Sequence, residues 1–336
     1  MQPTSPGQFA ASSSFLSGEG HLPAPERITA DTWAIALPLP HGGTVPYTLC
    51  YVLLDANGEA HLVDPGYGTD ENEALLRQGL AMLGAPAIRS VIVTHLHPDH
   101  LGMADRIRAA TGAKVVLHAR EQHAIETVRD AIESLDDLFE RWQVPAGSAP
   151  VVPSGRTVSL PLDSRPADVL IADGDLLDIP GREISVILTP GHTPGHLCLR
   201  DAAQSLLFTG DHVLPTVYPG LGLGGPTESN PIADYLDSID RIRGFDDHEI
   251  LPGHGYRFTG LAERCDQIVA HHLKRSREVA AALAEFPDAS VWETASRIRW
   301  TAGWQNLAGF NRYSALAQTE MHIGYLASQK ESQEVT

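Results

Sequence analysis

The sequence predicts an α/β protein in which two sheet-and-helix halves pack face to face, followed by a small all-α region. Two observations lead to this fold class. Short β-like segments give way to helical segments twice within the first 258 residues, an alternation typical of sheets covered by helices. Beyond residue 259 the spacing of apolar residues is helical, with no further strand.

The first half alternates β-like runs with helical segments. Asn57 and Gly58 predict a tight hairpin turn between two of the runs, and Gly84 and Gly112 predict helix ends. The strands are expected at residues 33–37, 48–54, 61–63, 90–93 and 114–118. The helices are expected at residues 71–83, 102–111 and 119–144.

A stretch rich in Pro, Gly and Ser, residues 145–166, predicts a loop before the second half. Asn230 and Pro231 follow a second Gly/Pro-rich stretch, residues 213–230, and predict a helix start. The second set of strands is expected at residues 169–171, 183–188, 197–199 and 205–208. The later helices are expected at residues 232–242, 261–286, 290–298 and 311–328.

Three segments follow from this pattern: a disordered leader at residues 1–27, a large α/β domain at 28–258 and a helical domain at 259–336. The leader has no basic residue before Arg27 and no apolar core of signal-peptide length, so a targeting signal is not expected. A helical appendage of this size is compatible with a homodimer.

Charge and cysteine content narrow the function classes. The 24 basic and 42 acidic residues give a net charge of −18, which repels phosphate backbones and anionic lipid surfaces. We therefore expect a small-molecule substrate, with neither nucleic acid nor a membrane as partner. The three cysteines are widely spaced and form no CxxC pair, as in a cytoplasmic protein with reduced thiols.

The densest chemical motif is Thr94-His95-Leu96-His97-Pro98-Asp99-His100, directly after an apolar run. A strand that ends there delivers three imidazoles and a carboxylate into one turn. Imidazole nitrogen and carboxylate oxygen together suit zinc and its first-row neighbours. The motif therefore predicts a metal site.

Three more candidate ligands follow apolar strands in the same way: His192 in TPGHTPGH, Asp211 in FTGDH and His254 in LPGHG. Together with the first motif they supply enough ligands for two divalent ions that share one carboxylate, because a shared anion offsets the repulsion between two dications. The seven candidate metal ligands are His95, His97, Asp99, His100, His192, Asp211 and His254.

These four motifs, with VDPG at residues 63–66, resemble the metallo-β-lactamase superfamily over residues 30–256. The resemblance implies a four-layer αββα sandwich with two Zn²⁺ ions per chain, Fe or Mn being the alternatives. It implies that His95, His97 and His192 hold the first ion and that Asp99, His100 and His254 hold the second. Asp211 would bridge the two ions, and Asp64 would orient a ligand or its loop.

The bridging aspartate is typical of the glyoxalase II-like and lactonase-like hydrolases of the superfamily and of its nucleases. The tract from 211 to 240 and the helical tail also look similar to the β-lactamase-like-protein-2 group, in which a small winged-helix-like domain follows the catalytic one. The tail here has no wing strands, which argues against a wing that reads DNA.

The sequence thus predicts a dinuclear zinc hydrolase that uses a hydroxide shared by the two ions on an ester, thioester or lactone-like carbonyl. Asp211 would be catalytic as the bridge, and Asp99 as the proton carrier if the second metal site is only partly filled. The alternatives are a metal-dependent ribonuclease or phosphodiesterase, and a mononuclear-iron sulfur dioxygenase that shares the first motif. Leu214, Tyr218 and Leu221 favour an uncharged acyl substrate.

Further histidines and tryptophans have structural interpretations. His196 is expected to be a buried support, His212 a structural or rim group, and His118 and His123 surface or supporting groups. His271, His272 and the basic residues after them predict a solvated helix face. The tryptophans expected to pack between helices are Trp292, Trp300 and Trp304.

Overall fold

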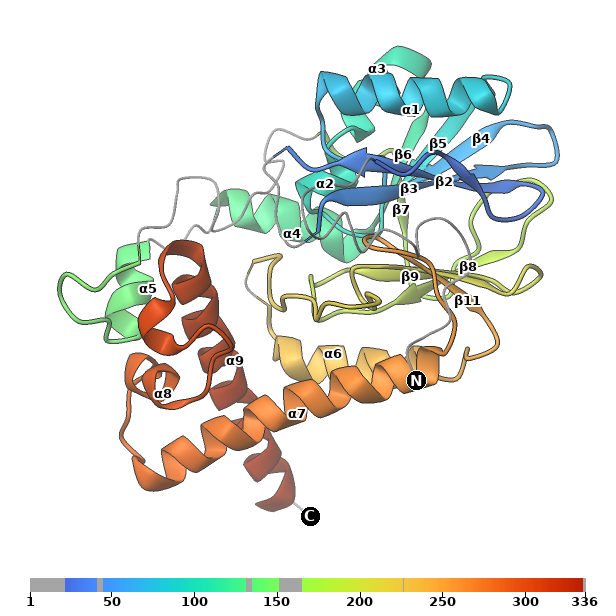
Figure 1. Ribbon diagram of the computed structural model, residues 1–336. Helices are drawn as coiled ribbons and strands as arrows, with labels where there is room; N and C mark the ends of the chain where they lie inside the picture. The colour runs from blue at the N-terminus through green and yellow to red at the C-terminus, as the bar shows by residue number, and fades with distance from the viewer. Residues whose placement is uncertain (1–21, 41–44, 131–134, 151–164, 226, 335–336) are drawn as a thin grey trace.

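The computed structural model describes residues 22–40, 45–130, 135–150, 165–225 and 227–334. Two β-sheets lie face to face at its centre, and helices cover their outer sides (Figure 1). The predicted αββα sandwich is therefore confirmed. Residues 1–21 of the predicted leader and 151–164 of the predicted loop lie outside the described residues.

The first sheet has seven strands in chain order, antiparallel from β1 to β4 and parallel from β4 to β7. Its strands are β1 (Glu26–Arg27), β2 (Thr32–Pro38), β3 (Tyr47–Leu54), β4 (Ala60–Val63), β5 (Ile88–Ile92), β6 (Lys114–His118) and β7 (Val169–Ile171). Successive side chains of a strand face opposite sides of the sheet. In β3, Cys50 and Val52 accordingly face the outer core, and Leu49 and Tyr51 face the second sheet.

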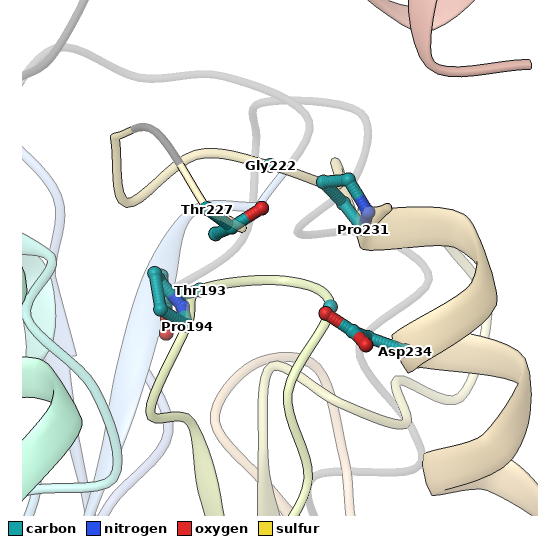
Figure 2. Close-up of a pocket in the computed structure, with 7 residues that line it drawn as sticks. Thr193, Pro194, Gly222, Thr227, Pro231 and Asp234 are labelled. Atoms are coloured by element: carbon teal, nitrogen blue, oxygen red, sulfur yellow. The ribbon is translucent and has the colours of Figure 1, made fainter. Parts of the chain in front are cut away.

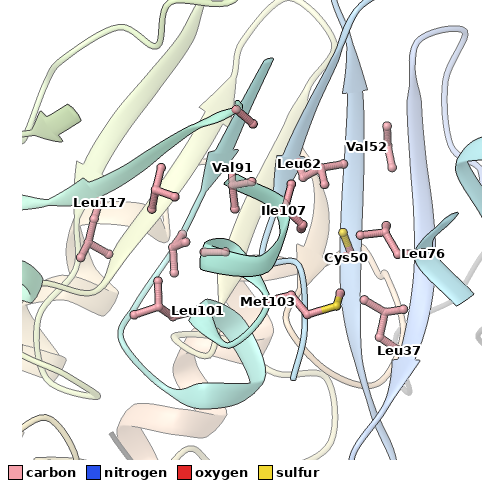
Figure 3. Close-up of a cluster of buried hydrophobic side chains, with 14 of the residues drawn as sticks. Leu37, Cys50, Val52, Leu62, Leu76, Val91, Leu101, Met103, Ile107 and Leu117 are labelled. Carbon is pink, nitrogen blue, oxygen red and sulfur yellow. The ribbon is translucent and has the colours of Figure 1, made fainter. Parts of the chain in front are cut away.

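Helices α1 (Asp70–Met82) and α3 (Ala104–Thr111) cover the outer face of this sheet (Figure 1). Figure 3 shows the resulting core, where Leu76 of α1 and Ile107 of α3 pack with Leu62 and Val91. α3 ends at Gly112, whose φ of 76° is accessible to glycine without steric cost. This glycine fulfils the predicted helix stop.

Two shorter connections complete this half. Helix α2 (Pro98–Leu101) is a single turn that carries part of the HLHPDH motif. Helix α4 (Ala119–Asp130) starts directly after β6 and buries Ala124 and Ile125 in the same core. The N-termini of both helices therefore lie at the sheet edge where the parallel strands end.

The second sheet has four strands in the order β11-β10-β9-β8. They are β8 (Ile184–Leu188), β9 (Leu197–Asp201), β10 (Leu206–Gly210) and β11 (Glu249–Pro252). Helices α6 (Pro231–Ile242) and α7 (Leu261–Glu285) cover its outer face (Figure 1), where Tyr235 and Ile268 are fully buried. The predicted cap is confirmed, because the Asn230 side chain accepts hydrogen bonds from the first turn of α6.

Helices α8 (Val291–Arg297) and α9 (Gly309–Glu334), with a 3₁₀ turn at Trp304–Asn306, follow α7. Within the described part of the chain from 259 to 334 no strand forms, which agrees with the predicted lack of a wing. Helix α5 (Leu135–Arg141) joins this region, because Phe139 and Trp142 pack against Ala295 and Leu316 (Figure 1). The cluster also contains the three tryptophans expected to pack between helices.

Two strand assignments differ from the prediction. Residues 169–171 were expected to begin the second sheet, but β7 pairs in parallel with β6 and closes the first one. Glu26 and Arg27, assigned to the leader, form β1 and pair with Ala34 and Trp33. Both strands are too short for their own side-chain pattern to specify a partner.

The predicted solvated face around His271 and His272 is confirmed for Lys274 and Arg277, which are exposed, but it is wrong for the histidines. His272 and Ser276 are buried, and the His271 ring stacks on Tyr218 with ring centroids 3.8 Å apart. α7 lies against both α6 and α9, which cover this side of the helix, whereas Gln267, Lys274 and Arg277 on the opposite side are exposed. Among the described residues, no helix combines the length and apolar character needed to cross a bilayer.

Candidate metal centre

Two groups of potential metal ligands meet where β5, β8, β10 and β11 end. His95, His97, His192 and Asp211 form the first group, and Asp99, His100 and His254 form the second. Within each group the ligand atoms lie within 4.8 Å of one another. The structure therefore brings together all seven predicted ligands, which come from four separate segments of the chain.

Three imidazoles converge in the first group. His97 Nδ1 lies 2.9 Å from His95 Nε2 and 3.1 Å from His192 Nε2. The outward nitrogens of two of these rings face carbonyl oxygens: His97 Nε2 donates to Leu223 O at 3.1 Å, and His192 Nδ1 donates to Gly220 O at 2.6 Å. Because a carbonyl can only accept, each inward nitrogen carries a lone pair when its ring is neutral.

Burial keeps the imidazoles of the first group neutral. It lowers the pKa of His192 to about 4, with His97 adding to the effect, and it lowers the pKa of His95 well below its usual range. The lone pairs of His97 and His192 therefore point at each other across 3.1 Å. A cation between them would remove this repulsion, so the donor set fits a metal ion.

The second group mixes imidazole and carboxylate. His254 Nε2 lies 3.2 Å from Asp99 Oδ2, and His100 Nε2 lies 3.6 Å from the same oxygen. Burial lowers the pKa of His100, but the carboxylates of Asp99, Asp64 and Asp211 outweigh burial and raise it to about 9. These carboxylates favour positive charge at this point, which a divalent cation would supply.

Asp211 lies between the two groups. Its Oδ1 is 3.3 Å from His254 Nε2 and 3.5 Å from His100 Nε2, whereas its Oδ2 is 3.7 Å from His192 Nε2. Asp211 Oδ1 and His100 Nε2 are both buried without a hydrogen-bond partner. Buried polar atoms are almost always paired, so these two atoms also fit a bound cation.

The remaining outward nitrogens are held as firmly. His254 Nδ1 donates to Tyr47 O at 2.8 Å, and His100 Nδ1 donates to Asp64 Oδ2 at 2.8 Å. Partners of this kind fix the tautomer and ring orientation of metal-binding histidines. The structure places Asp64 behind His100, where the resemblance implied a residue that orients a ligand.

Glycines make room for this arrangement. A Cβ at Gly253 would lie 2.6 Å from Asp211 Oδ1 and 2.7 Å from His100 Cε1, closer than any real side chain tolerates. Gly210 precedes Asp211 with a φ of 47°, a left-handed conformation that favours glycine. The glycines that flank the ligand motifs therefore serve close approach between loops.

The other histidines divide into support and surface groups. His196 is fully buried, where its Nδ1 contacts Thr189 Oγ1 at 2.9 Å and its Nε2 accepts from the Asp211 amide at 3.1 Å, as expected for a support. His212 is buried against the Tyr235 ring. His118 is buried at the end of β6, where its Nδ1 accepts from the Arg120 amide, and His123 is exposed on α4.

One buried acidic residue had no signal in the sequence. Glu121, in the first turn of α4, accepts hydrogen bonds from Leu96 N at 2.8 Å and from Gly195 N at 2.5 Å. An acidic residue at a helix start ordinarily stabilises the helix dipole at the surface. The contacts of Glu121 with two distant loops become visible only in the folded chain.

A hollow of about 610 Å³ adjoins the ligand-bearing loops. It is lined by Arg120, His123 and Thr127 of α4, and by Gly224, residues 227–229 and Asp234. Figure 2 shows the adjoining pocket, where Thr193 and Pro194 lie across from Pro231 and Asp234. The hollow meets the ligand-bearing loops through Pro194, and none of the seven candidate ligands lines it.

The residues expected to favour an acyl substrate do not line this hollow. Leu221 packs in the core under α6 and α7, and Leu214 is buried. Tyr218 is exposed but lies on His271 of α7. From the Gly/Pro-rich stretch, the residues that line the hollow and the adjoining pocket are Gly222, Gly224 and residues 227–229.

The family model of the metallo-β-lactamase superfamily matches residues 43–254. The chain belongs to this superfamily. A solved metallo-β-lactamase family protein from Thermus thermophilus superposes with a TM-score of 0.71 at 27% identity, covering 90% of this chain and 95% of that protein. The family and the two ligand groups together indicate a hydrolase that binds divalent metal ions.

The chain is also similar to three curated relatives. A β-lactamase-like protein 2 homolog from Caenorhabditis elegans is 25% identical over 77% of the chain and 74% of its own length. An acyl-coenzyme A thioesterase, MBLAC2, from Bos taurus is 27% identical over 55% of the chain. An atrochrysone carboxyl ACP thioesterase from Aspergillus fumigatus is 23% identical over 69%. The chain spans 62% and 58% of the length of these two thioesterases.

Proposed function

We propose that this protein is a thioester hydrolase that depends on two zinc ions. The observation that carries the proposal is the position of Asp211, whose two carboxylate oxygens face different ligand groups. A pair of cations, one in each group, could share this one carboxylate. His95, His97 and His192 would hold the first ion, and Asp99, His100 and His254 the second.

Bound divalent ions would supply Lewis acidity, which lowers the pKa of water and polarises a carbonyl oxygen. The protein contributes the rest. Asp99 keeps a fifth of its side chain exposed, and His100 and His254 outweigh burial and lower the pKa of its carboxyl below its usual value. In molecules whose second site is empty, Asp99 Oδ2 is thus an unprotonated, accessible acceptor, suited to take a proton from water and return it to the departing thiolate.

The thioester class is favoured by the relatives and by the hollow. Two of the relatives are thioesterases that act on acyl-coenzyme A and on an acyl carrier protein, and both carriers hold their acyl group on an anionic arm. Arg120 in the hollow is exposed, and its guanidinium has no ion-pair partner among the described residues. It is suited to attract such an arm.

The test is a panel of acyl thioesters, lactones, phosphodiesters and β-lactams, assayed with protein whose metals have been measured by elemental analysis. We expect two zinc ions per chain and the fastest turnover with thioesters. Asp211→Ala should bind fewer ions and lose at least about 100-fold in turnover, whereas Asp237→Ala, exposed on α6, should match the native protein.

Two outcomes would replace the proposal with an alternative. One iron per chain without hydrolysis would favour a sulfur dioxygenase. Faster cleavage of phosphodiesters than of thioesters, with salt-sensitive RNA binding, would favour a nuclease. The net charge of −18 argues against the nuclease, because an acidic surface repels RNA.

A further inference from the structure

Glu121 connects the two loops that supply the first ligand group. Its Oε2 accepts from the amide of Leu96, which lies between His95 and His97 in the sequence. Its Oε1 accepts from the amide of Gly195, three residues after His192. One side chain thereby holds the backbone next to all three imidazoles of this group.

The position of Glu121 is set by the fold and not by the loops. α4 is anchored by Ala124 and Ile125, which are buried in the outer core of the first sheet. A Cβ at Gly195 would lie 2.5 Å from the Glu121 amide nitrogen and 2.8 Å from Arg120 Cβ. Gly195 therefore allows the loop to approach the helix closely enough for the hydrogen bond to form.

The chemical identity of the side chain matters at this position. Glu121 is completely buried and has no cationic partner among the described residues, and burial raises the pKa of its carboxyl to about 7. A glutamine would be easier to bury, but its amide could accept only one of the two N–H groups. Both oxygens of a carboxylate can accept hydrogen bonds, so glutamate can bind the amides of both loops at the same time.

We infer that Glu121 is a positioning residue that holds His95, His97 and His192 in the geometry that binds the first metal ion. The inference rests on the ligand assignment proposed above. Residues outside the ligand set that orient metal-binding side chains typically change metal affinity 10- to 100-fold. An effect of that size, confined to one of the two ions, separates this role from a general contribution to stability.

The test compares zinc binding to apoprotein of the native chain, Glu121→Gln and Glu126→Gln, by competition with a chromophoric chelator. Glu126 is exposed on the same helix and serves as the control. We expect Glu121→Gln to weaken one binding step by about 10- to 100-fold and leave the other step and the apoprotein melting temperature unchanged. Glu121→Asp, too short to span both amides, should show the same loss if Glu121→Gln does not fold.

Two backgrounds identify which ion is affected. The loss of zinc affinity caused by Glu121→Gln should persist in the His254→Ala background, in which only the first ligand group is intact. It should disappear in the His192→Ala background, in which the first group is disrupted. Equal weakening of both steps with a lower melting temperature, or no change in either step, would overturn the inference. A native protein that binds no divalent ion would instead overturn the ligand assignment itself.

Discussion

Asp64 reaches both ligand groups through one carboxylate. Its Oδ2 accepts from His100 Nδ1 at 2.8 Å and from Thr94 Oγ1 at 2.7 Å. The Thr94 hydroxyl in turn lies 3.0 Å from His95 Nδ1, from which it can accept a hydrogen bond. The residue adopts a φ of 54°, an uncommon value outside glycine that the surrounding hydrogen bonds maintain.

We predict that Asp64→Asn weakens the binding of both metal ions, because asparagine has one acceptor oxygen in place of two. Asp64 Oδ1 accepts from the Thr94 amide, and Oδ2 accepts from His100 and the Thr94 hydroxyl, so one side of the new amide would face donors with its NH₂ group. Asparagine tolerates the left-handed conformation as well as aspartate does, so the backbone should be retained. The expected loss is about 10- to 100-fold in affinity for each ion, measured by the same chelator competition. A loss at one ion alone would contradict the shared role.

Arg120 is the residue that we expect to discriminate between substrates. Arg120→Glu should raise KM for thioesters with an anionic arm by roughly 5- to 10-fold, because an exposed charge contributes modestly. The kcat for these substrates and the KM for neutral thioesters should not change. Arg77→Glu, exposed on α1, is the control, and an equal effect on neutral thioesters would exclude the charge explanation.

The sequence made the ligands predictable but not the residues that hold them. His95, His97, Asp99 and His100 stand within six positions of one another, a density that has no packing explanation. Glu121 accepts from the Leu96 amide, 25 residues away in the sequence, and the Leu223 carbonyl accepts from His97 Nε2, 126 residues away. Such contacts depend on how loops meet in space, and no local pattern records them.

At the scale of helices, α7 and α9 enclose a polar pair. His322 Nδ1 of α9 lies 2.9 Å from Ser276 Oγ of α7, and His272 is buried beside it. Burial, with His271 and Arg275 nearby, lowers the pKa of His272 to about 4, and burial with the same neighbours and His272 lowers that of His322 to about 3. The folded helices therefore hold both imidazoles uncharged.

This burial predicts loss of stability in acid. Both folded pKa values lie below the unfolded value of about 6.5, so the stabilisation is complete above pH 6.5 and is lost as pH falls toward 4 and 3. Each histidine should lower the free energy of unfolding by about 2 kcal/mol as the pH falls from 6.5 to 5. Urea unfolding at both pH values should show a smaller loss for His272→Gln/His322→Gln; an equal loss would contradict the prediction.

The helical pattern of residues 261–286 was predictable, but its environment was not. Lys274, Arg275 and Arg277 cluster on a segment whose periodicity alone suggests a solvated face. The fold places α6 and α9 against α7, and the Arg275 guanidinium lies 4.3 Å from the Trp300 ring centroid. Charged side chains can cover apolar surface in this way while their ends stay near water.

For the whole molecule, the layer order followed from the sequence because the apolar periods change from two to 3.6 at clear Gly and Pro boundaries. The sheet to which β7 belongs could not be predicted from the sequence, because its three residues, Val169–Ile171, are too few to show a side-chain pattern that specifies a sheet. The assignment of residues 28–258 and 259–336 to separate domains remains a prediction.

Metal removal should affect the entire fold, because the ligands come from both sheets. A ligand at 1,000 times its Kd stabilises the folded state by about 4 kcal/mol, which corresponds to roughly 5–15 °C in Tm for a chain of this size. A chelator should lower Tm by that amount and added zinc should restore it. In Asp211→Ala the shift should be much smaller; a chelator that leaves the native Tm unchanged would contradict this linkage.

Helix α5 connects the α/β part of the molecule with the C-terminal helices. After β6 the chain departs from the first sheet, and Phe139 and Trp142 pack in the cluster formed with α8 and α9. The chain then returns to the first sheet as β7, which pairs with β6. A protein cut after residue 258 would keep these aromatic side chains and lose their cover. Such a fragment should self-associate, so the C-terminal helices cannot be exchanged between relatives unless the 135–142 segment travels with them.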